Sequence, residues 1–424
     1  METKIGDYVE RHSDRLFGHI QELVRRDTQN TPPVGREAGA QQYLASVLEG
    51  CGWQPELYEL DAVPGLRQHE LFFGRRDYQG RPNLGARRKG AGGGRSLILS
   101  GHADTVPRGT QPWTRDAFGG EIEGNRLYGR GSNDMKAGLA INAFVAEAVE
   151  DLGMRLRGDL IFESVVDEEF GGVNGTLAGR LRGYVADGAI LSEPSFLRIC
   201  PAQRGGRVAH ITLAASGGIL TEGRYPAGVI DQVTHLLNGV RAFADARRRV
   251  APTHPLYAGV DPVPVSVTKI ITAPWGNAEP ITTPEECRIE LYWQTMPGET
   301  QRDIEAGFFA WFDGMVAESP NLFPRRPVVE FPLRFLPGSA IPADHPLVTE
   351  LAACATETLG QAPPVAGIEG PCDMYVFHEF GIPAALWGPR GGNTHAADEY
   401  VELDTVISAA KTLLSFVARW CGVA

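Results

Sequence analysis

The sequence has no pair of cysteines at a metal-binding spacing. Its cysteines are scattered and none belongs to a Cys-x-x-Cys motif: Cys51, Cys200, Cys287, Cys354, Cys372 and Cys421. A zinc site built from cysteine is therefore not expected. Their even number would allow disulfide bonds. For a chain of 424 residues, however, buried thiols in a reducing compartment are the better prediction.

Long apolar runs and an excess of basic residues are also missing. The first residues, Met1–Asp7, contain no apolar segment typical of a signal peptide, and no stretch is long enough to cross a membrane. With 40 Lys and Arg against 52 Asp and Glu, the net charge is −12. This charge argues against nucleic acid and anionic membranes as partners. We expect a cytoplasmic protein.

The composition is typical of a folded chain with more than one domain. At 424 residues and 43% hydrophobic content, the chain is too long for one ordinary domain and can form real cores in two. Its 51 Gly and 30 Pro are spread among apolar runs, which indicates many tight turns rather than disorder. Short apolar strands and amphipathic helices follow one another, so the sequence predicts an α/β protein.

The predicted elements form an interrupted domain. Residues 1–205 and 338–424 share the α/β pattern, whereas residues 206–337 read strand, helix, strand, strand, helix, strand, the order of a complete ferredoxin-like βαββαβ unit. We therefore predict an α/β domain in two parts with an inserted ferredoxin-like domain. Short strands are predicted in the first part at 57–60, 69–73, 82–86, 96–100, 159–166 and 188–192, and the last strand of the insert is predicted at 327–335.

Side chains with metal-binding chemistry stand at strand ends, at a helix start and in a glycine-rich loop. They are two histidines, three carboxylates and a spare carboxylate: His102, His395, Asp134, Glu169, Glu193 and Glu168. In open α/β sheets, ligands bind at the carboxyl ends of strands. Asp134 begins a helix predicted over 134–150, where free amides and the helix dipole favour a carboxylate. Two imidazoles and three carboxylates suit a pair of divalent ions.

Each of these residues has a simpler alternative. A histidine at a strand end is often only hydrogen-bonded, as we expect for His69, His210 and His235. Asp134 could cap its helix, and the two adjacent glutamates could form a solvated turn. His378 competes with His395 as the last ligand, although it lies on a predicted helix. Asp373 could serve the site or support a loop.

At these residues the chain resembles the dinuclear zinc metallopeptidase and amidohydrolase family of acetylornithine deacetylase, succinyl-diaminopimelate desuccinylase, aminoacylase and glutamate carboxypeptidase. The similarity lies in the runs Gly-His-Ala-Asp-Thr-Val-Pro at 101–107, Tyr-Gly-Arg-Gly at 128–131, Asp-Met-Lys at 134–136 and Glu-Glu-Phe-Gly-Gly at 168–172. It extends almost from end to end. The resemblance implies a zinc-aminopeptidase-like catalytic domain with an inserted lid and dimerisation domain, and hence a homodimer.

The resemblance also implies a role for each residue. His102 and Glu193 would bind one ion, and Glu169 and His395 the other, with Asp134 between them. The ions would be Zn²⁺, although Co²⁺ or Mn²⁺ could substitute. Asp104 would orient the His102 ring. Glu168 would be the general base toward a metal-bridged hydroxide and then an acid toward the leaving amine.

The inserted segment departs from the family pattern. Thr221 stands where the family places a histidine that stabilises the oxyanion from a neighbouring subunit, and Gln294 stands where it places an arginine that anchors a carboxylate. Losing one oxyanion donor typically lowers the rate by ~10²–10³. Arg204, Arg207, Arg224 and His210 are candidates for replacement donors.

Three functions are compatible with these residues. The first is a two-metal hydrolase that cleaves the amide bond of an N-acyl amino acid or peptide-like substrate, including one without a free α-carboxylate. The second keeps the metals but catalyses a non-hydrolytic carbonyl reaction such as condensation, cyclisation or elimination, because the lid histidine and arginine are replaced. The third is a non-enzymatic scaffold, which a complete ligand set disfavours.

Overall fold

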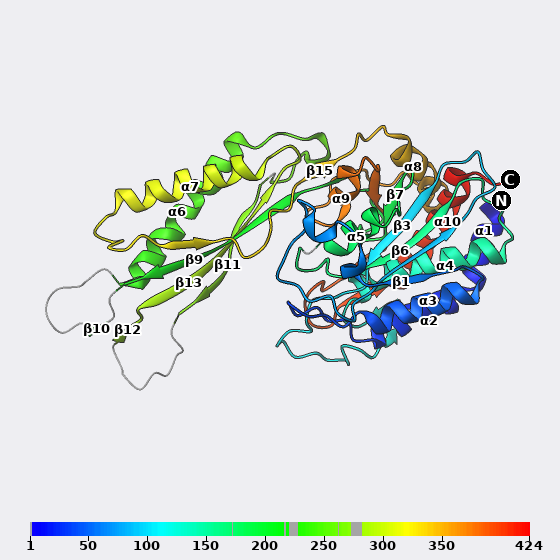
Figure 1. Ribbon diagram of the computed structural model, residues 1–424, viewed down its shortest axis with the longest axis horizontal. Helices are drawn as coiled ribbons and strands as arrows, with labels where there is room; N and C mark the ends of the chain where they lie inside the picture. The colour runs from blue at the N-terminus through cyan, green and yellow to red at the C-terminus, as the bar shows by residue number, and fades with distance from the viewer. Residues whose placement is uncertain (1, 172, 216–217, 220–227, 262, 273–281) are drawn as a thin grey trace. The chain divides into compact units, whose positions relative to one another are not determined.

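A computed structural model describes residues 2–171, 173–215, 218–219, 228–261, 263–272 and 282–424 (Figure 1). The chain divides into two compact units. The first comprises Met1–Ala202, Ala340–Ile368 and Cys372–Ala424, and the second comprises Gln203–Ser339 and Glu369–Pro371. The second unit extends slightly beyond the segment 206–337 predicted from the sequence, and its role as a lid or dimerisation domain stays a prediction.

The first unit is built on a mixed sheet. Its six strands lie in the order β1 (Glu56–Tyr58), β2 (Asn83–Arg88), β6 (Leu160–Val165), β3 (Leu97–His102), β7 (Ala189–Leu191) and β16 (Ala384–Leu386). From β6 to β16 the neighbours are parallel, whereas β2 is antiparallel to both β1 and β6. Strands β3, β6 and β7 are buried along their whole length, which explains their continuous apolar sequences.

Helices bury the two faces of this sheet (Figure 1). They are α1 (Glu2–Arg11), α2 (Ser13–Arg25), α3 (Ala38–Gly50), α4 (Ala137–Asp151), α5 (Asn174–Leu181), α8 (Pro346–Leu359), α9 (Met374–Glu379) and α10 (Leu403–Cys421). Helix α4 lies against β3 and β6 and is flanked by α2, α3 and α10. It is buried almost all round, because its small and apolar residues pack on every side. The resulting core holds the strand ends rigidly.

A second, smaller sheet of the first unit was not predicted. Its order is β17 (Gly391–Gly392), β18 (Tyr400–Glu402), β5 (Arg126–Tyr128) and β4 (Ile122–Glu123). Strand β18 pairs with both β17 and β5 in antiparallel register. This pairing brings the loop between β17 and β18 beside the chain that follows β5, although the two segments are far apart in the sequence.

The second unit contains the predicted ferredoxin-like arrangement. Its sheet has the order β11 (Val265–Ile271), β13 (Glu286–Thr295), β9 (Gly205–Ala214) and β14 (Val328–Glu330), with antiparallel neighbours throughout. Helices α6 (Val229–Val250) and α7 (Gln301–Glu318) connect the strands. Aromatic rings form much of its core; Trp293 and Phe308 stack with ring centroids 5.2 Å apart. Short elements complete the unit: β10 (Gly218–Ile219), β12 (Thr282–Thr283) and η4 (Pro255–Tyr257).

Two sequence-based assignments were wrong in detail. Residues 69–73 form no strand; they follow the 3-10 turns η1 (Leu60–Ala62) and η2 (Leu66–Gln68). The amide of Phe73 donates to the Asn174 side chain at 3.0 Å, so a side chain replaces a strand partner. The strand expected over 327–335 is confined to β14. Beyond it the Leu333 carbonyl accepts a bond from the Arg207 guanidinium at 2.7 Å.

The remaining short strands, β8 (Ala202–Gln203) and β15 (Ser339–Ala340), lie where the chain passes from one unit to the other. Among the described residues, no helix combines the length and the apolar composition needed to cross a membrane.

Helix α4 approaches β7 so closely that one glycine is required. A Cβ on Gly138 would lie 2.0 Å from the carbonyl oxygen of Ser192, whereas a Cβ on Gly18 in α2 would meet no atom within 4 Å. We predict that Gly138→Ala destabilises the first unit by ~1–3 kcal/mol, the usual result of overpacking. Gly18→Ala should stabilise it by about 0.5–1 kcal/mol, because alanine favours a helix more than glycine. Calorimetric unfolding of the metal-free variants measures both changes, and equal shifts would contradict this packing.

Candidate metal centre

His102 ends strand β3 with one ring nitrogen already engaged. Its Nδ1 lies 2.9 Å from the backbone carbonyl oxygen of Asp104. A carbonyl can only accept, so Nδ1 donates and the neutral ring has its lone pair on Nε2. The Asp104 carboxylate is farther away, 3.6 Å from the same nitrogen. The ring is therefore oriented chiefly by the backbone of Asp104 rather than by its side chain. With its lone pair on Nε2, His102 can serve as a metal ligand through that atom.

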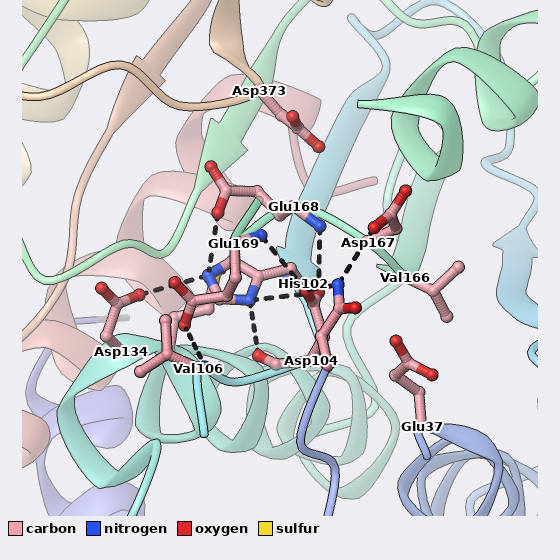
Figure 2. A network of polar contacts seen from close by, with 12 residues as sticks. Glu37, His102, Asp104, Val106, Asp134, Val166, Asp167, Glu168, Glu169 and Asp373 are labelled. Carbon is pink, nitrogen blue, oxygen red and sulfur yellow. Dashed lines mark hydrogen bonds and ion pairs between the residues drawn. The ribbon is translucent and has the colours of Figure 1, made fainter. Parts of the chain in front are cut away.

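Three carboxylates surround Nε2 of His102, and Figure 2 shows two of them, Asp134 and Glu168. Asp134 Oδ1 lies at 3.2 Å, Glu193 Oε1 at 3.7 Å and Glu168 Oε2 at 3.8 Å. Glu168 follows β6 and Glu193 follows β7, the strands on either side of β3, so these three parallel strands deliver His102 and both carboxylates to the same edge of the sheet. This is the placement expected from the apolar runs that precede them.

His395 and Glu169 form the other half of the cluster. Nε2 of His395 lies 3.0 Å from Glu169 Oε2 and 3.4 Å from Asp134 Oδ2. Asp134 therefore directs one carboxylate oxygen toward each histidine. The structure brings together all five side chains predicted as ligands and the predicted base. His395 is the most exposed of them, with 48% of its side chain accessible, whereas His102 is buried.

The Asp104 carboxylate supports the turn that carries Glu168 and Glu169 (Figure 2). Its two oxygens accept the backbone amides of these residues, each at 3.1 Å. The Asn30 amide donates to the same carboxylate at 2.9 Å and to Asp167 at 3.0 Å. Asp104 was predicted to orient the His102 ring; its carbonyl oxygen contacts that ring, and its carboxylate in addition holds the backbone of the predicted base and of one ligand. Asn30 was not singled out, because nothing in its local sequence separates it from an ordinary turn residue.

The electrostatics of the cluster are dominated by negative charge. Burial and neighbouring acids raise the pKa of Glu193 to about 8 and that of Glu169 to about 7, against the attraction of the histidines. Burial also raises the pKa of Asp373 to about 7. For His395, burial lowers the pKa but bonds to Asp134 and Glu169 outweigh it and raise it to about 10. A bound divalent cation would offset the repulsion between these acids.

The donor set fits divalent cations. Among the ion pairs of the described residues, the carboxylates of Asp134, Glu168, Glu169 and Glu193 pair with histidine alone. One donor atom each from His102, Asp134 and Glu169 lies within 4.8 Å of the others. Carboxylate oxygens and imidazole nitrogens are the ligands of zinc, and manganese and cobalt accept the same set. Placing several acids together in the protein without a Lys or Arg partner becomes favourable when cations bind to them.

Two further candidates from the sequence, His378 and Asp373, also lie in the first unit, but only Asp373 interacts with the cluster. His378 lies on α9 and its Nε2 donates to the Ala384 carbonyl at 3.2 Å, so its ring is engaged in the fold. Asp373 accepts a bond from the Thr176 hydroxyl and lies near enough to His102 to interact with it electrostatically. Asp373 therefore both supports a loop and contributes charge to the cluster (Figure 2).

The predicted lid residues lie in the second unit or outside the described residues. Thr221 and Arg224 belong to the residues that the structure does not describe. The Gln294 side chain accepts a bond from Arg204 at 2.8 Å. The Arg207 guanidinium is paired with Glu305 and packs 4.0 Å from the centroid of the Phe331 ring.

Another replacement candidate is also engaged inside this unit. Nε2 of His210, on β9, lies 2.9 Å from the Glu290 carboxylate on the neighbouring strand β13. Gln294, Arg207 and His210 thus all have partners of their own, and their proposed contact with substrate stays a prediction.

Comparisons with known proteins agree with this geometry. The family model described as peptidase family M20/M25/M40 matches residues 98–419. N-formyl-4-amino-5-aminomethyl-2-methylpyrimidine deformylase of Bacillus subtilis is 25% identical over 97% of this chain and 96% of its own length. Succinyl-diaminopimelate desuccinylase of Cereibacter sphaeroides is 31% identical over 77% of this chain and 84% of its own. The dipeptidase Dug1p of Saccharomyces cerevisiae shares the fold with a TM-score of 0.76 at 13% identity, covering 99% and 98% of the two chains.

If the cluster binds divalent ions, metal should stabilise the first unit through Glu169. We predict that Zn²⁺ or Co²⁺ raises the unfolding temperature of the protein stripped with a chelator, because only the folded chain assembles the ligands. In Glu169→Gln, which removes the partner 3.0 Å from His395, most of this rise should be lost.

A histidine–glutamate pair elsewhere provides the control. Glu290 lies 2.9 Å from His210 in the second unit, so Glu290→Gln changes a similar pair without changing the cluster. This variant should show the full metal-dependent rise in differential scanning calorimetry. A normal rise in Glu169→Gln would show that the ions bind elsewhere.

Proposed function

The chain belongs to peptidase family M20/M25/M40 and is a hydrolase acting on C–N bonds, and from this premise we propose that it is a two-zinc deacylase. The observation that carries the proposal is the convergence of two imidazoles and four carboxylates at one edge of the sheet. His102 and Glu193 would hold one ion, Glu169 and His395 the other, and Asp134 both. When bound, the ions would acidify water and polarise the carbonyl of the scissile amide.

Glu168 is the residue placed to move protons. It follows the same strand as Glu169, yet its carboxylate contacts His102 at 3.8 Å and is not needed to complete either ligand set. Its backbone amide is fixed by Asp104, so the side chain starts from a defined position. A carboxylate there can take a proton from the attacking water and deliver it to the nitrogen of the leaving amine.

The substrate that we propose is a small N-acyl amine without an α-carboxylate, such as an N-formyl aminomethyl derivative of a nitrogen heterocycle. Gln294 stands where the family pattern places an arginine for a carboxylate, and its side chain is already bonded to Arg204. The deformylase of Bacillus subtilis, which matches almost the full chain, is named for an N-formyl aminomethylpyrimidine, a compound without a carboxylate. Both observations support a neutral substrate over an N-acyl amino acid.

The relatives' names also bear on the non-hydrolytic alternative. A deformylase and a desuccinylase both remove an acyl group from nitrogen by hydrolysis. The family therefore supports hydrolysis of an amide for this chain, and the identity of the acyl group and of the amine is what we propose.

We predict that zinc- or cobalt-loaded protein releases amine from N-formyl aminomethyl heterocycles with a kcat/KM at least about 10-fold above that for N-acyl amino acids. A neutral substrate lacks the carboxylate that an arginine would otherwise hold, and such contacts direct binding strongly. Glu168→Gln should abolish turnover, since it removes the base, while two ions remain bound. The measurement is amine release across a panel of formyl, acetyl and succinyl amides, with metal content determined in parallel.

Two results would contradict the proposal in different ways. Preferred hydrolysis of N-acyl amino acids would refute the substrate class but keep the mechanism. Full turnover by Glu168→Gln would refute the base. Asp61→Asn, an exposed acid paired with Arg67 on the surface, is the control and should turn over normally.

We also propose a homodimer formed through the second unit, with zinc as the metal in both subunits. Strand β11 is an edge of its sheet, and Ile270 and Ile271 on it are 48% and 61% exposed. Exposed apolar side chains on a sheet edge commonly mark a surface for another chain. Light scattering should give about twice the chain mass of 45.9 kDa, and Ile271→Lys should reduce it to the mass of one chain. A monomeric wild-type protein would remove the dimer and leave the metal centre unaffected.

A further inference from the structure

Glu399 is a buried carboxylate that no step of the proposed reaction uses. The whole residue has no exposed surface. Its Oε1 accepts the backbone amides of Asn133 and Asp134, each at 3.1 Å. Its Oε2 accepts the amide of Gly131 at 3.0 Å and the Arg130 guanidinium at 2.6 Å. One side chain thus binds three of the four backbone amides of residues 131–134, the segment that presents Asp134.

Further contacts join the two segments on which Glu399 and Asp134 lie. The Asn133 side chain donates to the Thr394 hydroxyl at 2.7 Å, and the Arg130 guanidinium donates to the Ala396 carbonyl at 3.1 Å. The amide of Gly129 donates to the Glu399 carbonyl at 2.8 Å. These bonds hold the loop after β5 against the loop after β17, which carries His395. The position of Asp134 relative to His395 is therefore set by this contact region.

The two halves of the cluster differ in how the backbone supports them. His102 ends strand β3 and Glu193 follows strand β7, and the ladders of these strands fix the backbone there. Asp134 lies in the turn η3 (Ser132–Lys136) but has non-helical angles, φ −118° and ψ 98°. His395 has φ 62° in an irregular loop. Neither Asp134 nor His395 is held by regular hydrogen bonding, so side-chain contacts must place them.

We propose that Glu399 is a positioning residue for the ion held by Glu169, His395 and Asp134, and that it acts through the backbone of the Asp134 loop without touching metal or substrate. The inference rests on the proposed metal ligands. It predicts an asymmetry between the two ions. The ion at His102 and Glu193 shares only Asp134 with these loops and otherwise depends on strand ends, whereas the other ion has both Asp134 and His395 on the two loops that Glu399 joins.

The test is a cobalt titration of Glu399→Gln. Glutamine has one acceptor oxygen where glutamate has two, and its NH₂ group would face amide donors and leave Arg130 without its charge partner. We expect the Co²⁺ held by Glu169 and His395 to bind about 10–100-fold more weakly, the usual effect of changing a group that supports a metal ligand. The Co²⁺ at His102 and Glu193 should be weakened less, because Asp134 is its only ligand on the affected loops. Isothermal titration calorimetry gives the two affinities, and the visible absorption of Co²⁺ reports the geometry of each ion separately from turnover.

A milder variant keeps the test valid if Glu399→Gln folds poorly. Thr394 is exposed, so Thr394→Val should fold normally while removing the acceptor for the Asn133 side chain. It should weaken the same Co²⁺ ion in the same direction by a smaller factor. Unchanged affinities for both ions in both variants would overturn the proposal.

The second unit offers a matched control. Glu299 accepts both Arg247 guanidinium nitrogens, at 2.7 and 2.9 Å, and the backbone amide of Met296 at 2.7 Å. Glu299→Gln therefore removes a buried carboxylate with the same kinds of partners and should leave both cobalt affinities unchanged. If Glu299→Gln also weakened cobalt binding, a specific role for Glu399 would be overturned. If the wild-type protein bound no cobalt, the proposed function itself would be refuted. If Glu399→Gln bound cobalt as the wild type does, only the role of Glu399 would be refuted.

Discussion

Repulsion among the buried carboxylates of Asp134, Glu168, Glu169 and Glu193 is the constraint on which the first unit depends. Without a cation, only two imidazoles oppose this repulsion, and the raised pKa values of Glu193 and Glu169 record it. If the backbone around the cluster were free to move, the repulsion would turn these side chains away from one another and into solvent. The strand ends, the loop bonds and the packing of α4 against β7 prevent that relaxation, so the ligands remain assembled for an ion.

Around the cluster, carboxylates hold the backbone next to the ligands, and most of the positively charged groups lie on the outer side of these carboxylates. Backbone amides next to the ligands donate to buried carboxylates, Asp104 for the turn at 168–169 and Glu399 for the loop at 131–134. These acids would add to the repulsion, but partners on their outer side offset much of it. Arg130 pairs with Glu399 at 2.6 Å, and Asn30 links Asp104 to Asp167, which itself pairs with Arg76 at 3.1 Å. The positive groups thus stay outside, where they cannot occupy the place of a metal ion.

Much of this site could be predicted from the sequence because its ligands follow short-range patterns. His102, Glu169 and Glu193 come directly after apolar runs, and the parallel order of their strands then brings them to one edge. What could not be predicted depends on pairing between distant segments. The small sheet that joins β18 to β5 has strands of two or three residues, too short to show a period. Glu399 reaches the Asp134 loop only because that sheet pairs β18 with β5. The bond from His102 to the backbone carbonyl of Asp104 could not be predicted either, because every residue has a backbone carbonyl. The strand expected at 69–73 failed for the related reason that a side chain, Asn174, took the place of a neighbouring strand.

The charge of the assembled site also bears on the proposed substrate. Two divalent ions bring four positive charges, and Asp134, Glu168, Glu169 and Glu193 bring four negative ones when ionised, so the loaded centre is close to neutral. A substrate with an α-carboxylate would then need a separate cationic group to offset the desolvation of its charge. Gln294, which we predicted to stand at the family's arginine position, has its side-chain oxygen bonded to Arg204. Arg204 in turn donates to the Asp261 carbonyl at 2.6 Å and packs over Tyr257. Moving Arg204 to an anionic substrate would break these contacts inside its own unit, whereas a neutral N-acyl amine requires no such change.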